Sequence, residues 1–350
     1  MHKPPHESSI RAPRPRARSL PPLARRQRGV ALLIAILLVA LGTMVAAALA
    51  YNNAMTARRT IADFSYDQAL LITEGVEAYS AYGLWLVHKN DPNVTYPGQG
   101  WDQPLNVSPS PGVNVQASLE DLQGRFNLND LIESKGNGVT PNLTALAVFQ
   151  RLLEMVGLQP VWAEDVVNWI DTSPTPLFPQ AASDTQYLEM APPYYAPNRP
   201  ITSTSELLAL PGFGRERFEK IAPYITALPV GTALNICSAS PVVLDAFLGH
   251  REYSVDPKRF ASDRQAAGGC FPSMQEFQTA FSNMLPGGTL GGSSPTWAQI
   301  EPLIGDESSY FRLSTFVRAG TTEFAFYSLL YQDDGEDGKV LTLLRSDTPN

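Results

Sequence analysis

The sequence is poor in the residues on which most catalytic and metal sites depend. Its 350 residues include only 2 cysteines and 4 histidines. No H-E-x-x-H, G-x-S-x-G or P-loop motif occurs. His2 and His6 lie near the N-terminus, and His88 and His250 have no partner residue close by in sequence. These absences argue against an enzyme, and no catalytic residue is predicted.

Charged residues are also scarce, at 17% of the chain against 44% hydrophobic residues. This balance excludes wholesale disorder, because enough apolar surface is available to form a core. A chain of this length holds one large or two ordinary domains and is no small disulfide scaffold. The only cysteines, Cys237 and Cys270, allow a single pairing and fit no C-x-x-C metal or redox spacing.

The few charges are unevenly distributed. Residues 1–29 carry eight lysines and arginines against one glutamate, so with a whole-chain charge of -8 the remainder carries -15. A body this acidic repels polyanions, so nucleic acid is not expected to be its main partner.

One long hydrophobic run stands out near the N-terminus. Residues Val30–Ala50 contain no charge and nothing more polar than Gly42 and Thr43. A helix of this length is about 30 Å long, which matches the hydrocarbon core of a bilayer. The basic residues just before it predict a cytoplasmic N-terminus and place the rest of the chain across the membrane.

The junction RQRG followed by VALLI brings basic residues and a glycine directly against the apolar run. It resembles the prepilin class of signal, which a dedicated peptidase cuts on the cytoplasmic side. The resemblance implies cleavage between Gly29 and Val30 and methylation of the new Val30 amine. A plain signal anchor is the first alternative. A secretory signal peptide cut within Ala46–Ala50 is another, although its apolar core would be shorter than this one.

A helical stripe follows the apolar run, because hydrophobic residues recur in steps of mostly three or four. We expect the run and this stripe to form one long helix whose outer half packs on the soluble body, as in type IV pilins and pseudopilins. The stripe consists of Ile61, Phe64, Ala69, Ile72, Val76, Tyr79, Gly83 and Leu86.

The remaining chain predicts an α+β body with a large inserted α-helical domain. Alternation predicts a strand around residues 113–119 and three more near the C-terminus, at 310–318, 323–331 and 339–345. Helical patterns fill the interval, at 142–156, 161–170, 206–210, 215–226, 241–248 and 274–285. The predicted domains are a leader (1–29), the membrane (30–50) and periplasmic (51–90) halves of the N-terminal helix, a sheet body (91–125 and 305–350) and the insert (126–304).

Four segments resemble the K-type minor pseudopilins of type II secretion systems, and they occur in the order expected for that family. They are DLQGRFNLNDL (121–131), VVNWID (166–171), APNRPITSTSELLALPGF (196–213) and TALNICSASPVVL (232–244). The resemblance implies a pilin-like fold, with a long N-terminal helix packed on a small antiparallel sheet.

It also implies a place in the inner membrane and then at the tip of the periplasmic pseudopilus. The expected partners are minor pseudopilins of the I and J types, through them the major pseudopilin, and the prepilin peptidase. The secretin and exported proteins are further candidate partners. Most pilins carry a glutamate five residues after the cut, where Ile34 stands here. A subunit without this carboxylate cannot use it to neutralise the amine of a neighbour in the fibre, which agrees with a tip position.

The segment from Ile170 to Glu206 is the candidate metal site. Its carboxylates and carbonyls are hard oxygen ligands, which suit Ca²⁺. The family resemblance implies a structural calcium ion and points to Asp171, Asp184 and, with less support, Glu206. Thr172 and Ser173 stand where the family often has another acid. The alternative is that Asp171 caps a helix and that the other carboxylates are solvated.

Two further features remain open. In the periplasm a Cys237–Cys270 disulfide is favoured, with two buried free thiols as the alternative. The segment 204–226, with ELLALPGFGRERFEKIAPYI at 206–225, matches the helix-hairpin-helix pattern. Its turn amides would contact phosphate, with help from Arg215, Arg217 and Lys220. A membrane-anchored DNA receptor is therefore the alternative function.

Overall fold

The computed structural model describes residues 28–135, 138–172, 176–249, 257–266, 268–270, 273–282, 296–333, 335 and 337–348. The predicted leader, except for its last two residues, and His250 lie outside this range. The chain divides into two compact units, Met1–Phe64 and Ser65–Asn350.

The first unit is described from residue 28 onward and consists of the first part of helix α1 (Arg28–Asn90, 63 residues). No proline interrupts the helix, and its most apolar window has a mean hydropathy of 2.8. By length and composition this helix can cross a membrane. The Thr43 hydroxyl donates to the Ala40 carbonyl oxygen, so this polar group inside the apolar run is satisfied within the helix.

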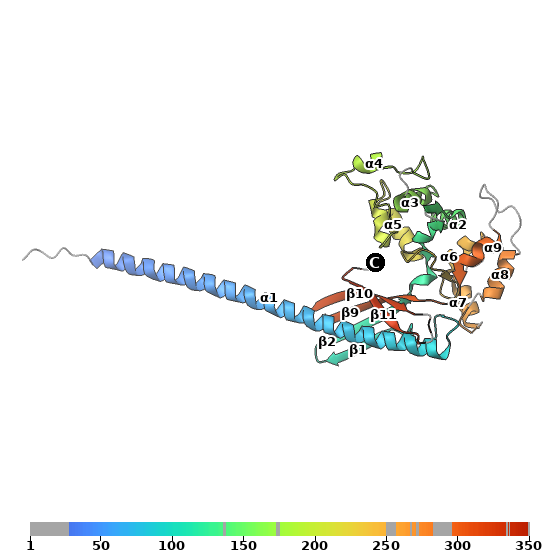
Figure 1. Ribbon diagram of the computed structural model, residues 1–350. Helices are drawn as coiled ribbons and strands as arrows, with labels where there is room; N and C mark the ends of the chain where they lie inside the picture. The colour runs from blue at the N-terminus through green and yellow to red at the C-terminus, as the bar shows by residue number, and fades with distance from the viewer. Residues whose placement is uncertain are drawn as a thin grey trace, which may run out of the picture. The chain divides into compact units, whose positions relative to one another are not determined.

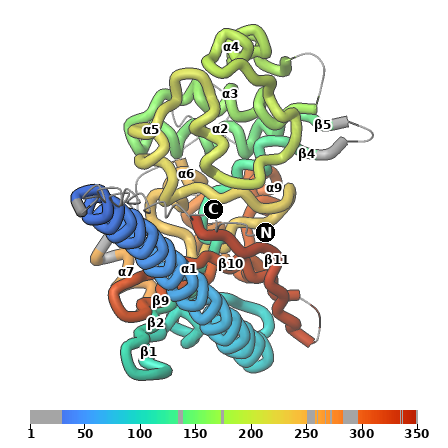
Figure 2. Tube along the Cα trace, turned by 90° about the vertical axis from the view of Figure 1, so that its left-hand side faces the viewer, coloured from blue at the N-terminus to red at the C-terminus, as the bar shows by residue number. Residues whose placement is uncertain are grey.

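In the second unit, the rest of α1 lies along one face of a five-stranded antiparallel sheet (Figures 1 and 2). The strand order is β1-β2-β9-β10-β11, with β1 (Leu105–Ser110) and β11 (Val340–Ser346) at the edges. Between them lie β2 (Val113–Asp121), β9 (Tyr310–Ala319) and β10 (Thr322–Gln332). The four predicted strands are confirmed, whereas β1 was not predicted.

The register of the sheet follows from the alternation of its side chains. Val115 lies opposite Val317, and both are fully buried under α1 with Leu313 and Leu330. The β9–β10 hairpin turns at Gly320, whose φ of +62° belongs to the left-handed region that favours glycine. A small hydrophobic core therefore lies between α1 and the sheet.

Helices dominate the chain between the strands β2 and β9. Each helical pattern predicted there corresponds to an observed α or 3₁₀ helix. However, 206–210 forms a 3₁₀ helix, residues 225–226 are extended, and the predicted positions 283–285 lie outside the described residues. The sequence patterns missed α4, α7 and α9. The helices are α2 (Leu143–Met155), α3 (Trp162–Ile170), α4 (Asp184–Leu188), α5 (Gly214–Ile221), α6 (Pro241–Leu248), α7 (Pro257–Ala266), α8 (Met274–Ser282) and α9 (Trp297–Ile300), with 3₁₀ helices η1 (Leu122–Gly124), η2 (Leu128–Leu131), η3 (Thr204–Ala209), η4 (Ala222–Tyr224) and η5 (Glu301–Leu303).

Three short strand pairs accompany these helices. β3 (Phe126–Asn127) pairs in parallel with β6 (Ile225–Thr226), and β7 (Leu234–Asn235) pairs in parallel with β8 (Ile304–Gly305). β4 (Ile132–Lys135) pairs with β5 (Gly138–Pro141) in antiparallel fashion. The helical segment has its own hydrophobic core, which includes Phe149, Leu152 and Phe247 and is separate from the core under α1.

Candidate functional site

The predicted processing junction lies at the beginning of α1. Gly29 has no other atom within 4 Å of the position that a Cβ would occupy, and the side chain of Val30 is 59% exposed. Arg25 and Arg26 lie outside the described residues. Within the described part of the first unit, nothing therefore packs against the junction, and cleavage there stays a prediction.

Past the predicted span, α1 packs on the sheet with a face that only partly coincides with the predicted stripe, of which Ala69 and Val76 are buried. Its buried residues are Ala69, Thr73, Val76, Glu77 and Leu84. The predicted stripe was partly wrong, because Tyr79 and Leu86 point away from the sheet and are 63% and 41% exposed. Ile61 and Phe64 belong to the first unit and are also exposed.

The outward side of α1 carries an apolar stripe of its own. We call Leu71, Tyr79, Tyr82 and Leu86 the outer stripe. Leu71 is 68% exposed and Tyr82 58% exposed, although their helix belongs to a unit with a well-formed core. At 100° per residue these four positions fall within one quarter of the helix circumference. An exposed apolar surface of this kind is typical of a protein-binding face.

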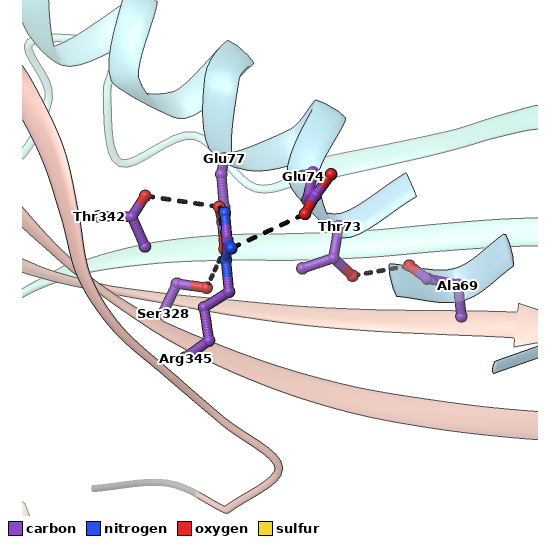
Figure 3. A network of polar contacts seen from close by, with 7 residues as sticks. All are labelled: Ala69, Thr73, Glu74, Glu77, Ser328, Thr342 and Arg345. Carbon is purple, nitrogen blue, oxygen red and sulfur yellow. Dashed lines mark hydrogen bonds and ion pairs between the residues drawn. The ribbon is translucent and has the colours of Figure 1, made fainter. Parts of the chain in front are cut away.

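A buried carboxylate joins α1 to the sheet (Figure 3). Glu77 is only 4% exposed. It accepts hydrogen bonds from Ser328 Oγ on β10 at 2.5 Å and from Arg345 on β11, with Nε and Nη2 at 2.9 and 2.7 Å from its two oxygens. Thr342 Oγ1 is 3.4 Å from Oε2. Burial alone would raise the pKa of Glu77, but the donors and the charge of Arg345 outweigh it, so the pKa lies below its ordinary value.

The segment 121–131 holds distant parts of the chain together through buried polar side chains. Asn127 accepts from the Leu228 amide, and Asn129 exchanges two hydrogen bonds with the backbone of Ile201. Gln123 accepts from the Ser309 amide. A Cβ on Gly124 would lie 2.8 Å from the Ser238 carbonyl oxygen, so this close approach requires glycine.

A second polar cluster lies where the sheet meets the helical segment. Asp121 Oδ2 accepts from Ser308 Oγ at 2.6 Å and from Asn235 Nδ2 at 3.2 Å. Asn235 Nδ2 also lies 2.7 Å from the Thr95 carbonyl oxygen. Burial raises the pKa of Asp121, although its hydrogen bonds oppose the shift. Asp121 belongs to the family-like segment 121–131, and Asn235 belongs to the family-like segment 232–244. Polar residues of both segments therefore form hydrogen bonds with distant parts of the chain.

The candidate calcium segment, Ile170–Glu206, is attached to α3 by hydrogen bonds. Asp165 Oδ1 accepts from the Ala182 amide at 2.6 Å, and Asn168 bonds to both backbone groups of Phe178. Trp169 Nε1 donates to Glu206 at 3.1 Å. These contacts by themselves tie parts of the segment 178–206 to α3.

The predicted calcium ligands do not come together as a set. Asp171 ends α3 as its C-cap, and Asp184 is exposed at the first turn of α4. Glu206 caps η3 and accepts from Thr202, Ser203 and Trp169. Burial by itself would raise its pKa, but these hydrogen bonds lower it below the ordinary value.

Across the described ranges, no group of three or more His, Cys, Asp or Glu side chains is placed to hold a metal ion. These residues therefore do not fit a three-carboxylate calcium site. The calcium ion itself stays a prediction.

The three cations of the helix-hairpin-helix-like segment each have a partner in the structure. Arg215 pairs with Glu219 at 2.6 Å and Lys220 with Glu216 at 3.1 Å. Arg217 donates to the carbonyl oxygens of Gly212 and Phe213 and lies over the ring of Trp162. Two of the three cations of α5 are thus paired with carboxylates of the same helix, which reduces the positive charge that this segment presents.

Cys237 and Cys270 form a disulfide, as predicted, with their Cα atoms 4.4 Å apart. Cys237 follows β7 and is fully buried, and Cys270 lies between α7 and α8. The bond therefore closes a loop that contains α6 and α7.

Comparison with known proteins agrees with these segments. Residues 124–230 match the family model described as "Type II secretion system (T2SS), protein K". The type II secretion system protein K of Klebsiella pneumoniae is 30% identical over 222 residues, which cover 62% of this chain and 68% of that protein. The chain belongs to the type II secretion system protein K family. The protein K of Pectobacterium carotovorum subsp. carotovorum is 28% identical and covers more, 87% of this chain and 93% of the relative.

A solved structure extends the likeness to the fold. It belongs to the crystal structure of the GspK-GspI-GspJ complex from the type 2 secretion system of enterotoxigenic Escherichia coli. The match has a TM-score of 0.67 at 20% identity and covers 82% of this chain and 98% of that chain. The pilin-like α+β fold expected for a protein K family member is thus confirmed, and the comparisons give no support to the DNA-receptor alternative.

Two features of this protein K family member were missed from sequence. One is Glu77, an acid within a largely apolar helix segment, and the other is the outer stripe. A helical projection that separates positions 69, 76 and 84 from 71, 79 and 82 would have indicated two apolar sides instead of one.

Proposed function

We propose that this chain is a minor pseudopilin that sits at the tip of the pseudopilus, where it helps to start and cap the fibre. Membership of the protein K family makes it a component of a secretion system, and no enzymatic role is proposed. Ile34 in place of the usual glutamate supports the tip position. So does the helical segment between β2 and β9, because a cap on a thin fibre has room for mass that a repeating subunit lacks.

The observation that carries the proposal is the dual character of α1. Its first part is apolar over the length of a bilayer, and its last part presents the outer stripe. Such a helix serves first as a single-pass inner-membrane anchor with a cytoplasmic N-terminus. It then serves as a packing surface for neighbouring subunits.

The proposed partners are minor pseudopilins of the I and J types, through them the major pseudopilin, and the prepilin peptidase. The solved structure supports the first two, because it is a complex of GspK with GspI and GspJ. The secretin and exported proteins are further candidates. We propose that the outer stripe meets the N-terminal helices of the I-type and J-type subunits.

The processing step tests the proposed route into the fibre. The mass and first residue of the mature protein are to be measured in cells with and without the prepilin peptidase. A start at methylated Val30 that depends on the peptidase is expected. A start near Tyr51, or an uncut N-terminus, would contradict the proposal.

The partner surface is tested separately with two matched leucines. Leu71 on α1 and Leu143 on α2 are each 68% exposed. In full-length protein, Leu71→Ser is expected to weaken co-purification with the I-type and J-type subunits, because it removes apolar contact area. Leu143→Ser is expected to leave co-purification unchanged. Equal behaviour of the two variants would argue against the outer stripe as the binding face.

A further inference from the structure

Helix α1 is apolar on two opposite sides where it lies on the sheet. Ala69, Val76 and Leu84 face the sheet and are at most 6% exposed, whereas the outer stripe is 41 to 68% exposed. Since both sides offer apolar side chains, burial of apolar area alone does not decide which side covers the sheet. Some other interaction has to select the rotation of α1 about its axis.

The sheet surface beneath α1 is partly polar. Ser328 and Gln332 are buried there at 2% and 6% exposure. Ser328 donates to Glu77, and Gln332 Nε2 donates to the Leu84 carbonyl oxygen at 3.1 Å. A helix rotated by half a turn would cover these groups with Leu71 and Tyr82. Ser328 would then be buried without a partner for its hydroxyl group, which is unfavourable.

Glu77 supplies the matching polar group on the helix side. In the observed rotation its carboxylate receives donors from β10 and from β11, and Arg345 binds it through both Nε and Nη2 (Figure 3). Glu74, one turn earlier, is 3.7 Å from Arg345 Nη1 and is the other carboxylate that reaches this arginine. Buried polar pairs of this kind add little net stability but can select one register among several apolar ones.

We propose that Glu77 and Arg345 are positioning residues that set the rotation of α1 on the sheet and so keep the outer stripe facing outward. The consequence for partner binding rests on the proposed function, whereas the rotation itself is a property of the isolated chain. Because Arg345 lies on β11, the last strand, its contribution to selecting the rotation of α1 begins only once the C-terminal strand has joined the sheet.

The rotation can be measured by thiol labelling of the full-length protein in detergent, without any partner. The two native cysteines are joined, so a single engineered cysteine is the only free thiol. Val76→Cys reports on the buried side of α1 and Ala78→Cys on the exposed side, two residues along the same helix. The quantity of interest is the ratio of the Ala78→Cys labelling rate to the Val76→Cys labelling rate.

In the otherwise unchanged protein this ratio is expected to be far above one. Glu77→Leu with Arg345→Met removes both charges, and the ratio is expected to fall toward one. The variant also takes the acceptor from the buried Ser328 hydroxyl, so a moderate fall in the melting temperature is expected. Glu74→Gln is the matched control and is expected to preserve the ratio. An unchanged ratio in the folded double variant would show that apolar packing alone sets the rotation, and this result would overturn the proposal.

A milder variant covers the case in which the double variant does not fold. Arg345 is half exposed, so Arg345→Gln removes the charge partner of Glu77 without creating a cavity in the core. A smaller fall in the ratio is expected, and an unchanged ratio overturns the proposal in this variant too. Partner binding by Leu71→Ser tests the proposed function alone. The labelling ratio of the Glu77→Leu with Arg345→Met variant, measured without any partner, tests the rotation alone, so the two ideas fail separately.

Discussion

Asp130 is a carboxyl group in a buried position, 8% exposed within η2. Its Oδ1 accepts from the Gly231 amide at 2.8 Å and from Asn127 Nδ2 at 3.0 Å. Burial raises its pKa to about 7, and these two donors offset only part of the effect. Near neutral pH the folded protein therefore holds a proton that the unfolded chain has lost.

This shift predicts a pH-dependent stability with a definite sign. Between the ordinary aspartate pKa of 3.8 and about 7, the folded state binds the extra proton, so stability falls as the pH rises and then levels off above 7. The full effect is about 4 kcal/mol at 1.36 kcal/mol per pH unit. Asp130→Asn keeps an oxygen acceptor and removes the charge. We expect its melting temperature, relative to the unchanged protein, to be higher at pH 8 than at pH 5.

Asp67→Asn, an exposed carboxylate on α1, is the control and should show no such trend. If Asp130→Asn follows the same pH profile as the unchanged protein, the proton of Asp130 is not responsible for the dependence.

The calcium prediction can also be tested by substitution of a single residue. A bound calcium ion would stabilise the folded state by about 2.7 kcal/mol at a concentration one hundred times its Kd. A chelator should then lower the melting temperature, and Asp184→Asn should abolish the calcium-dependent part of the shift. Asp184 is exposed, so its substitution is expected to leave the melting temperature in chelator unchanged. A melting temperature that does not respond to calcium or chelator would refute the prediction.

Among the structural elements, α6 and α7 depend most directly on the disulfide. The bond closes a loop between cysteines 33 residues apart. Constraining a loop of this size in the unfolded chain contributes about 3 to 4 kcal/mol. Cys237→Ala with Cys270→Ala is therefore expected to lower the free energy of unfolding by about that amount, as measured by denaturant titration. The unchanged protein should behave like the variant once its disulfide is reduced, and a smaller difference would mean that the α6–α7 packing does not need the bond.

The predicted and observed strands and helices show which elements can be predicted from local sequence patterns. Alternation predicted β2, β9 and β10 because one face of each strand is largely buried. β11 was also predicted from its sequence, although its residues are mostly exposed. α4 and α9 were missed because they are only 5 and 4 residues long, too short for a helical period to repeat. β1 was missed because its residues are mostly exposed and lack alternation.

For the whole molecule, charge decides between the two functions considered. Beyond residue 29 the chain carries -15, and two of the three cations of α5 are paired within that helix. We expect no binding of duplex DNA by the full chain at low salt, as measured by fluorescence anisotropy. Binding that falls steeply with salt and is lost in Arg215→Ala with Lys220→Ala would revive the DNA-receptor alternative.

Several properties of this protein were determined by the sequence alone. The membrane-spanning run, the order of strands and helices, the single cysteine pairing and the family resemblance all depend on residues that are contiguous or regularly spaced. A run such as Val30–Ala50 needs no tertiary partner to be recognised, because its length and lack of charge already meet the requirement for spanning a bilayer.

Other properties were decided only by the tertiary structure. Which side of α1 packs on the sheet depends on Ser328 and Arg345, more than 250 residues after Glu77. Likewise, the sequence named Glu206, with less support than Asp171 and Asp184, as a calcium ligand without showing its neighbours. Only the structure shows that its carboxylate caps η3 and accepts from Trp169. Helical periodicity reports only that a residue is apolar or polar, whereas the choice among faces or ligands depends on hydrogen-bond partners that the fold brings from distant parts of the chain.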